Sequence, residues 1–172
     1  AYAQAVGVYL ALAISRFSDR NNALCTWDSG PTGTKSSTGG SARTASLRNL
    51  FARQAIPMAW DFGEANPFSD SGGGFNSAFE WIEPAVKTLN GTISGHAEIA
   101  DAQSQLVSAQ KAVSTDPPYY DNIGYADLSD FFYVWLRKSL KPIYPSLFAT
   151  LAVPKAEELV ATPYRHGSKE KA

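Results

Sequence analysis

The sequence predicts an α/β fold with a helix-rich N-terminal region. Apolar residues recur at helical spacing from Ala1 to about Arg20, which predicts an amphipathic helix. Two short apolar runs, Thr92–Ser94 and Ala109–Thr115, are typical of strands, and the chain between them is long enough for a short parallel crossover. The second run stops at Asp116-Pro117-Pro118-Tyr119, because proline cannot donate to a sheet. Ligands bind at that edge of a parallel sheet, so this turn is the first candidate for a functional site.

The composition is that of a globular protein and excludes several classes. Hydrophobic residues make up 44% of the 172 residues and charged residues 18%. The formal net charge of -1 gives no global basic field, so any surface for nucleic acid must be local. No run approaches the ~20 apolar residues that span a membrane. The single cysteine fits a reducing, cytoplasmic compartment, and the two distant histidines have no zinc-ligand spacing, so no metal site is expected.

Residues 1–90 are predicted to form a helical region with long loops rich in glycine and serine. The glycine-rich block after the first helix lacks the spacing of a phosphate-binding loop and is typical of a flexible connection. A short helix is expected over Ser46–Ala55. A second amphipathic helix is expected from Asn76, kinked at Pro84 and ended by Asn90-Gly91.

Residues 91–172 are predicted to carry the two strands, the Asp-Pro-Pro-Tyr turn and another long helix. Asp127 or Ser129 is expected to cap this helix, which covers about residues 130–140. Its central residues are apolar on every side, which predicts a buried helix. The rest of the chain mixes loop with short helical stretches. His166, beside Arg165 and Lys169, falls in a basic tail that is expected to be mobile, and no role is expected for His166.

The turn and its surroundings resemble a known family. Asp116-Pro117-Pro118-Tyr119 is similar to the catalytic motif of the amino methyltransferases that modify an exocyclic nitrogen of adenine, or of cytosine, in DNA. The longer stretch Thr115–Arg137 resembles the adenine-specific DNA methylases that carry the DUF1156 region, and so do Leu151–Ala161 and Phe51–Trp60. The resemblance covers most of the chain and implies a partial Rossmann-like methyltransferase sheet.

The resemblance gives the residues of the turn catalytic roles that chemistry supports. An adenine N6 amine is a poor nucleophile because its lone pair is delocalised into the ring. The Asp116 carboxylate and the Pro117 carbonyl could accept both N–H bonds and localise that lone pair, and the prolines would hold the two acceptors rigidly. Tyr119 offers a ring on which a flipped base could stack. Further candidates for the base pocket are Pro118, Tyr120 and Asn122, although Asp121-Asn122 is equally typical of an ordinary turn.

The resemblance also implies S-adenosyl-L-methionine as the methyl donor and DNA as the partner. It places His96 and Ala97, at the end of the first predicted strand, near the adenine of the donor. Arg137, Lys138 and Lys141 are candidates for contacts with the DNA backbone, with a solvated helix end as the simpler interpretation.

The sequence departs from the family at the main cofactor loop. No apolar strand is followed by a glycine-rich turn of the Asp-Pro-Phe-x-Gly-x-Gly type. We expect that loop N-terminal to Ala1, so the chain is expected to be an internal piece of a longer enzyme, inactive alone and with little affinity for the donor. The alternatives are a non-catalytic nucleic-acid-binding or interaction module on the same scaffold, and methyl transfer to RNA or to protein amides.

Overall fold

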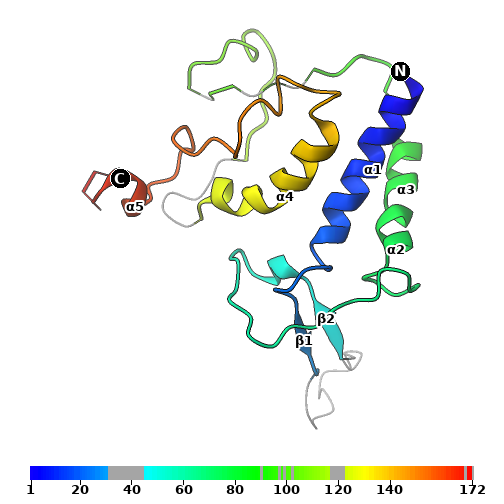
Figure 1. Cartoon of the computed structure of the whole chain (residues 1–172). Coiled ribbons are helices and arrows are strands. Elements are labelled where there is room, and N and C mark those ends of the chain that lie inside the picture. The colour runs from blue at the N-terminus through cyan, green and yellow to red at the C-terminus, as the bar shows by residue number, and fades with distance from the viewer. Residues whose placement is uncertain are drawn as a thin grey trace, which may run out of the picture. The chain divides into compact units, whose positions relative to one another are not determined.

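Two compact units divide the chain, Ala1–Asn90 and Gly91–Ala172, and each is described by itself. The computed structural model describes residues 1–30, 45–89, 91–96, 98, 100–101, 103–116, 123–168 and 170–171. These residues contain five α-helices, one short 3-10 helix and two strands (Figure 1). The structure is therefore a mixture of α and β elements in which helix dominates.

Helix α1, Tyr2–Ser18, is the longest element of the first unit and confirms the prediction from apolar spacing. Two asparagine side chains end it by satisfying carbonyl groups of its last turn. Asn21 Nδ2 donates to Phe17 O at 3.2 Å, and Asn22 Nδ2 donates to Ser18 O at 2.8 Å. The helix therefore ends where these asparagine side chains, in place of water, satisfy the carbonyl groups of its last turn.

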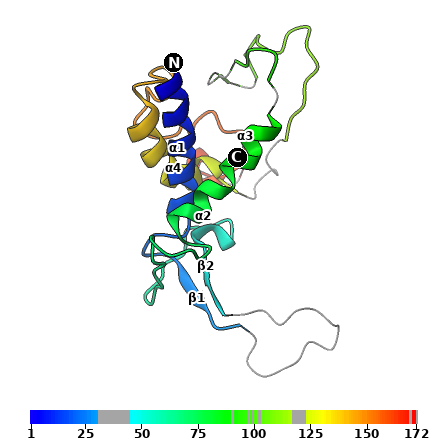
Figure 2. The same ribbon diagram turned by 90° about the vertical axis from the view of Figure 1, so that its right-hand side faces the viewer.

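Helix α2, Phe75–Glu80, lies against α1, and helix α3, Ile82–Thr88, follows it directly (Figures 1 and 2). The rings of Phe17 and Phe75 meet edge to face, with 5.7 Å between their centroids. The predicted single helix is thus divided in two just before Pro84. Proline lacks the N–H that would continue the hydrogen-bond ladder, and its ring crowds the carbonyl four residues earlier.

Strands β1, Thr26–Asp28, and β2, Ser46–Arg48, form a two-stranded antiparallel sheet in which Trp27 lies opposite Leu47. The prediction of a helix over Ser46–Ala55 is therefore wrong. Only the short 3-10 helix η1, Leu50–Ala52, coils in this stretch.

The reason lies in Asp19, just beyond the end of α1. Its main-chain carbonyl accepts a hydrogen bond from Leu50 N at 2.8 Å, and its carboxylate accepts from Asn49 Nδ2 at 2.8 Å and from Phe51 N at 3.2 Å. Leu50 N and Phe51 N are thus used in long-range bonds, whereas in a helix they would donate to carbonyl groups four residues earlier. Tertiary contact therefore overrides helix propensity over these residues.

The buried apolar residues of the first unit are mostly small. They are Ala11, Ala13, Cys25, Leu50 and Ala78. Small side chains let backbones approach closely, and Gly74 shows how closely. A Cβ atom at Gly74 would lie 1.8 Å from Ser69 O, so only glycine fits at this position. Gly74, the last of the three glycines before α2, is therefore required by packing.

Helix α4, Tyr125–Leu140, organises the second unit. It begins five residues earlier than predicted, and neither Asp127 nor Ser129 caps it. Ala126, Tyr133 and Leu140 recur every seven residues and share one face, and Tyr133 packs on buried Phe148 with 5.6 Å between ring centroids.

The opposite side of α4 is open in the described residues. Val134 is 59% exposed and Trp135 42% exposed, so the prediction of a helix buried all round is wrong. The second unit supplies apolar partners to only one face of α4, whereas a helix is buried on every side only when neighbours surround it.

The two predicted strands of the second unit are also wrong for the described residues. Residues 91–96 and 103–116 contain no strand. Turns occupy the region instead: Ala109 N donates to Leu106 O at 3.1 Å, and Gln110 adopts a φ of 59°, which no strand residue adopts. A strand needs a neighbour to pair with, and the described residues provide none here. The last element is helix α5, Pro163–His166, which begins with proline at its first turn.

Candidate functional site

The predicted catalytic residues fall on both sides of the boundary of the described chain. Asp116 is described and its side chain is exposed. Pro117 and Tyr119, and the base-pocket candidates Pro118, Tyr120 and Asn122, lie outside the described residues. The chain is described again from Ile123, two residues before α4 begins. The described part of the candidate site therefore consists of Asp116 and the start of α4.

The predicted contacts with the methyl donor do not form a binding site in the described residues. His96 Nε2 lies 3.0 Å from Glu98 Oε2, and the His96 side chain is 71% exposed. Ala97 lies outside the described residues. An exposed imidazole beside a carboxylate provides no enclosed surface for an adenine ring, so His96 as described does not fit that group.

The start of α4 is held by residues that lie far away in the sequence. Gly124 is the N-cap residue and has no side chain with which to cap the helix. Instead, Glu158 Oε1 accepts a hydrogen bond from Ala126 N at 2.9 Å, across 32 residues. A carboxylate at a helix N-terminus satisfies a free N–H group and interacts favourably with the helix dipole.

Arg165 joins this carboxylate to a second one. Its Nη1 pairs with Glu158 Oε2 at 2.5 Å, and its Nη2 pairs with Asp127 Oδ2 at 2.6 Å. Tyr164 donates its hydroxyl hydrogen to the same oxygen of Asp127. We call Asp127, Glu158, Tyr164 and Arg165 the tail clamp, because they attach the C-terminal segment to the start of α4.

The tail clamp shifts the pKa values of its members. The hydrogen bond from Tyr164, together with those from Arg165, holds the pKa of the Asp127 carboxyl below its usual range. The same bond raises the pKa of Tyr164, because an ionised phenol would lose its donor hydrogen next to a carboxylate. Partial burial lowers the pKa of Arg165, but its bonds to Glu158 and Asp127 outweigh burial and raise it. All of these shifts favour the paired, charged clamp at neutral pH.

A second ion pair supports the clamp one turn further along α4. Lys155 Nζ lies 2.5 Å from Asp130 Oδ2, and Asp130 Oδ1 accepts from Val153 N at 2.8 Å. Partial burial raises the pKa of Asp130, but the bonds from Lys155 and Val153 outweigh it, so this pKa is also lowered. The segment 153–165 is thus attached to the first two turns of α4 by charged groups.

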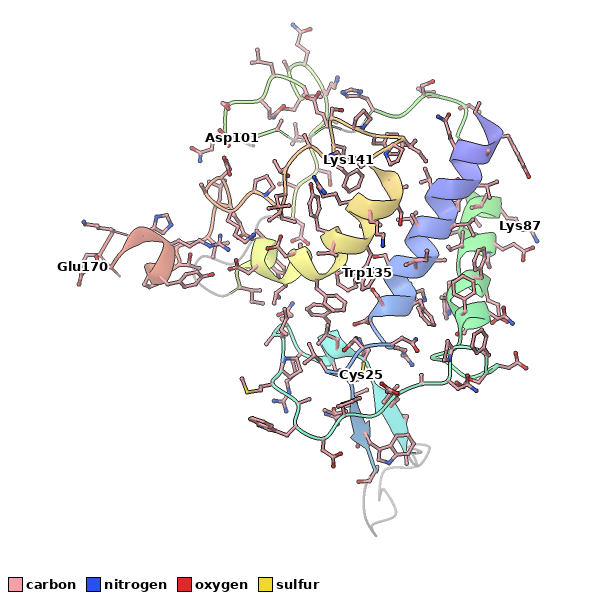
Figure 3. The ribbon with its side chains drawn as sticks, viewed as in Figure 1. Cys25, Lys87, Asp101, Trp135, Lys141 and Glu170 are labelled. Atoms are coloured by element: carbon pink, nitrogen blue, oxygen red, sulfur yellow. The ribbon has the colours of Figure 1, made fainter. Side chains whose placement is uncertain are left out.

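The basic residues at the other end of α4 have different roles. Arg137 Nε donates to Thr150 O at 2.8 Å, where the Tyr133 hydroxyl also donates, so Arg137 holds the turn after the helix. Lys138 and Lys141 are exposed, and Figure 3 shows Lys141 at the C-terminal end of α4. These two lysines are therefore the ones that remain accessible to a phosphate backbone.

A cavity of about 660 Å³ lies beside α4 within the second unit. Its lining is largely apolar and includes three carboxylates. The other lining residues are Ala100, Tyr133, Leu147, Phe148, Val153 and Pro154, and the carboxylates belong to Asp101, Glu157 and Glu158. His96 does not line this cavity. Glu158 connects the cavity to the tail clamp.

The described part of the chain contains neither a candidate metal site nor a candidate membrane span. No group of three His, Cys, Asp or Glu side chains there could hold a metal ion. Within the same residues, no helix combines the length and apolar character needed to cross a bilayer.

The tail clamp was not predicted from the sequence. Arg165 was expected to lie beside His166 in a mobile basic tail, whereas its side chain is only 13% exposed and makes two ion pairs. Thr162 and Pro163, a helix N-cap type followed by proline, are a local signal that the chain is ordered here. No local signal identifies the partners, because Asp127 lies 38 residues away from Arg165.

Comparison of the chain with protein-family models, with curated proteins and with solved structures finds no match.

Proposed function

We propose that this chain is part of an S-adenosyl-L-methionine-dependent DNA methyltransferase that acts on an exocyclic base amine, adenine N6 in particular. The observation that carries the proposal is the Asp116-Pro117-Pro118-Tyr119 motif, continued by a stretch that resembles the adenine-specific methylases through Arg137. The proposal includes a partial methyltransferase-like sheet, as the resemblance implies.

Asp116 and the Pro117 carbonyl would orient the amine. Two acceptors placed at its two N–H bonds turn the nitrogen lone pair out of the ring and toward the incoming methyl group. The exposed side chain of Asp116 leaves room for a base to approach. When it is bound, S-adenosyl-L-methionine supplies an activated methyl group. The base must leave the duplex, and Tyr119 would provide a stacking surface for it.

A methyl-transfer assay on the full-length protein tests this proposal. Asp116→Ala removes the carboxylate, so we expect kcat to fall by at least about 100-fold. Asp116→Asn keeps one acceptor oxygen and should give an intermediate rate. Asp61→Ala is the control. It removes an exposed aspartate from the first unit and should retain activity. Unchanged methyl transfer by the Asp116→Ala protein would refute the catalytic role.

The exposed lysines of α4 favour one second candidate, a nucleic-acid-binding module without catalysis. Lys138 and Lys141 lie one helical turn apart, which suits contacts with successive phosphates. Replacing both with alanine should weaken DNA binding and reduce the slope of log affinity against log salt by about two. Lys111→Ala, also exposed, is the control. This candidate replaces the first if DNA binding is found and methyl transfer is not.

A further inference from the structure

The cavity beside α4 has the size and the lining of a small-molecule site. Its volume of about 660 Å³ lies within the range of about 300–1,000 Å³ that is usual for such sites. Its lining includes two aromatic rings, those of Tyr133 and Phe148, whose centroids lie 5.6 Å apart. Because the Tyr133 hydroxyl donates to Thr150 O at 3.0 Å, Tyr133 offers a ligand its ring rather than a free donor.

The charged groups that line the cavity are all acidic in the described part of the chain. They are Asp101, Glu157 and Glu158, and no Lys, Arg or His among the described residues lines the cavity. Glu158 is already compensated, because Arg165 pairs with one of its oxygens and Ala126 N donates to the other. The negative charges that remain in the lining are those of Asp101 and Glu157.

Neither of these two carboxylates is paired with a cation in the described residues. Asp101 accepts hydrogen bonds from Gln103 N at 3.1 Å and from Ser104 Oγ at 2.8 Å, which are both neutral donors. The bond from Gln103, followed by that from Ser104, holds the pKa of the Asp101 carboxyl below its usual range, so Asp101 is ionised at neutral pH. Glu157 is exposed, and its side chain makes no hydrogen bond or ion pair with the described part of the chain.

The two cations closest in sequence to Glu157 are already paired. Lys155 Nζ lies 2.5 Å from Asp130 Oδ2 and also donates to Val153 O at 3.1 Å, and Arg165 is held in the tail clamp. Moving either cation to the cavity would break an ion pair that is partly shielded from water, which is unfavourable. Lys155 and Arg165 therefore do not neutralise the cavity.

We propose that this cavity binds a small organic cation, in which an ammonium group is attached to an aromatic or branched alkyl body. The apolar lining holds the body, and the faces of the Tyr133 and Phe148 rings attract the cation. Asp101 and Glu157 supply the opposite charge. A neutral ligand of the same shape gains only the apolar contact. This site is additional to methyl transfer and does not depend on it.

The test is a titration of the full chain with two probes, followed by amide chemical shifts. The probes are 3-hydroxyphenyltrimethylammonium and 3-tert-butylphenol, which have the same shape and differ in charge. We expect the cation to bind with a Kd on the order of 0.1–1 mM, a usual affinity for a ligand of about eleven non-hydrogen atoms. The neutral probe should bind at least about 5-fold more weakly. Raising the salt concentration from about 50 mM to about 500 mM should weaken binding of the cation only.

The contribution of charge is tested with Glu157→Gln. This variant should bind the cation about 3-fold to 10-fold more weakly and the neutral probe as well as the wild type does. Glu170→Gln is the matched control and should match the wild type. It removes one exposed carboxylate from the same unit, and Glu170, labelled in Figure 3, does not line the cavity.

The contribution of the rings is tested with Phe148→Leu. The variant keeps an apolar side chain but loses the ring, so it should bind the cation about 3-fold to 10-fold more weakly. Phe148 is only 6% exposed. If its replacement unfolds the second unit, the spectrum of the free variant shows the unfolding, and the comparison rests on Glu157→Gln.

Three results would overturn the proposal. Equal affinity for the two probes at low salt would mean that the cavity does not recognise charge. Equal affinity of Glu157→Gln and Glu170→Gln for the cation would mean that the carboxylate in the lining does not hold it. No shift at Tyr133, Phe148 and Val153 with about 10 mM of the cation would mean that the cavity is not a site for this class of ligand.

Discussion

The two units of the chain are held together by different kinds of contact. The first unit depends on close approach: small buried side chains, an aromatic edge-to-face pair, and Asp19 accepting from neutral donors. The second unit depends on charge: Arg165 and Lys155 pair with three carboxylates, and two of these, Asp127 and Asp130, lie on α4. Contacts of the first kind respond to changes in shape, whereas those of the second respond to pH and salt. The Asp-Pro-Pro-Tyr motif belongs by sequence to the second unit.

The largest effect should follow from a change of shape in the first unit. Gly74→Ala places a methyl group 1.8 Å from Ser69 O, so the backbone must move. We expect the free energy of unfolding of the first unit to fall by about 3 kcal/mol. Urea denaturation, followed by hydrogen exchange in α1 and α4 separately, would measure it. Gly91→Ala is the control, since a Cβ atom there meets nothing within 4 Å. A loss under about 0.5 kcal/mol would contradict the assignment of Gly74.

A change of shape in the second unit should have a somewhat smaller effect. Leu140 is 5% exposed and lies on the apolar face of α4, so Leu140→Ala should destabilise this unit by about 2–3 kcal/mol. Leu151→Ala, at a leucine that is 85% exposed, should cost less than about 0.5 kcal/mol. Equal losses for both variants, measured by urea denaturation, would mean that the second unit has no apolar core and is held by charge alone.

Acid should loosen the second unit more than the first, with a smaller effect than either substitution. The pKa values of Asp127 and Asp130 are lowered in the folded unit, so the unfolded chain binds protons more tightly. The stability they contribute is present above the ordinary aspartate pKa of about 3.9 and is lost as the pH falls through the lower folded values. Hydrogen exchange at the start of α4, measured between about pH 5 and pH 2, would show this loss of stability.

Asp127→Asn separates this effect from general acid unfolding. The amide cannot take up the proton, so the exchange of this variant should depend less on pH than that of the wild type. An identical pH profile for the two proteins would show that Asp127 is not the titrating group.

The smallest effect should follow from removing a charge in the first unit. Arg48 Nε and Nη2 both donate to Asp28 Oδ2, at 2.9 and 2.8 Å, but the Arg48 side chain is 42% exposed. Arg48→Ala should therefore change stability by about 0.5 kcal/mol, since exposed ion pairs contribute little. A loss above about 2 kcal/mol in urea denaturation would show that the first unit also depends on charge, and would remove the contrast between the units.

Patterns within one element could be interpreted from the sequence. The apolar spacing of α1 predicted that helix, and Pro84 predicted the interruption between α2 and α3. Helix α4 was predicted, but its start was placed too late, because its cap is Glu158, 32 residues away. The strands expected at 92–94 and 109–115 were wrong because a strand is stabilised by a partner that a local pattern does not reveal.

The candidate site divides in the same way. The sequence alone predicts Asp116 and its neighbours as candidate site residues, because a motif of consecutive residues is visible without a structure. It also determined the helical character of α1 and α4, which follows from spacing along the chain. Only the tertiary structure determined that Asp19 turns residues 46–52 away from an α-helix, and that Arg165 joins Asp127 to Glu158. The contacts from Asp19 to Asn49 and from Arg165 to Asp127 join residues that lie 30 and 38 positions apart. Which of these distant groups meet is decided by folding rather than by local propensity.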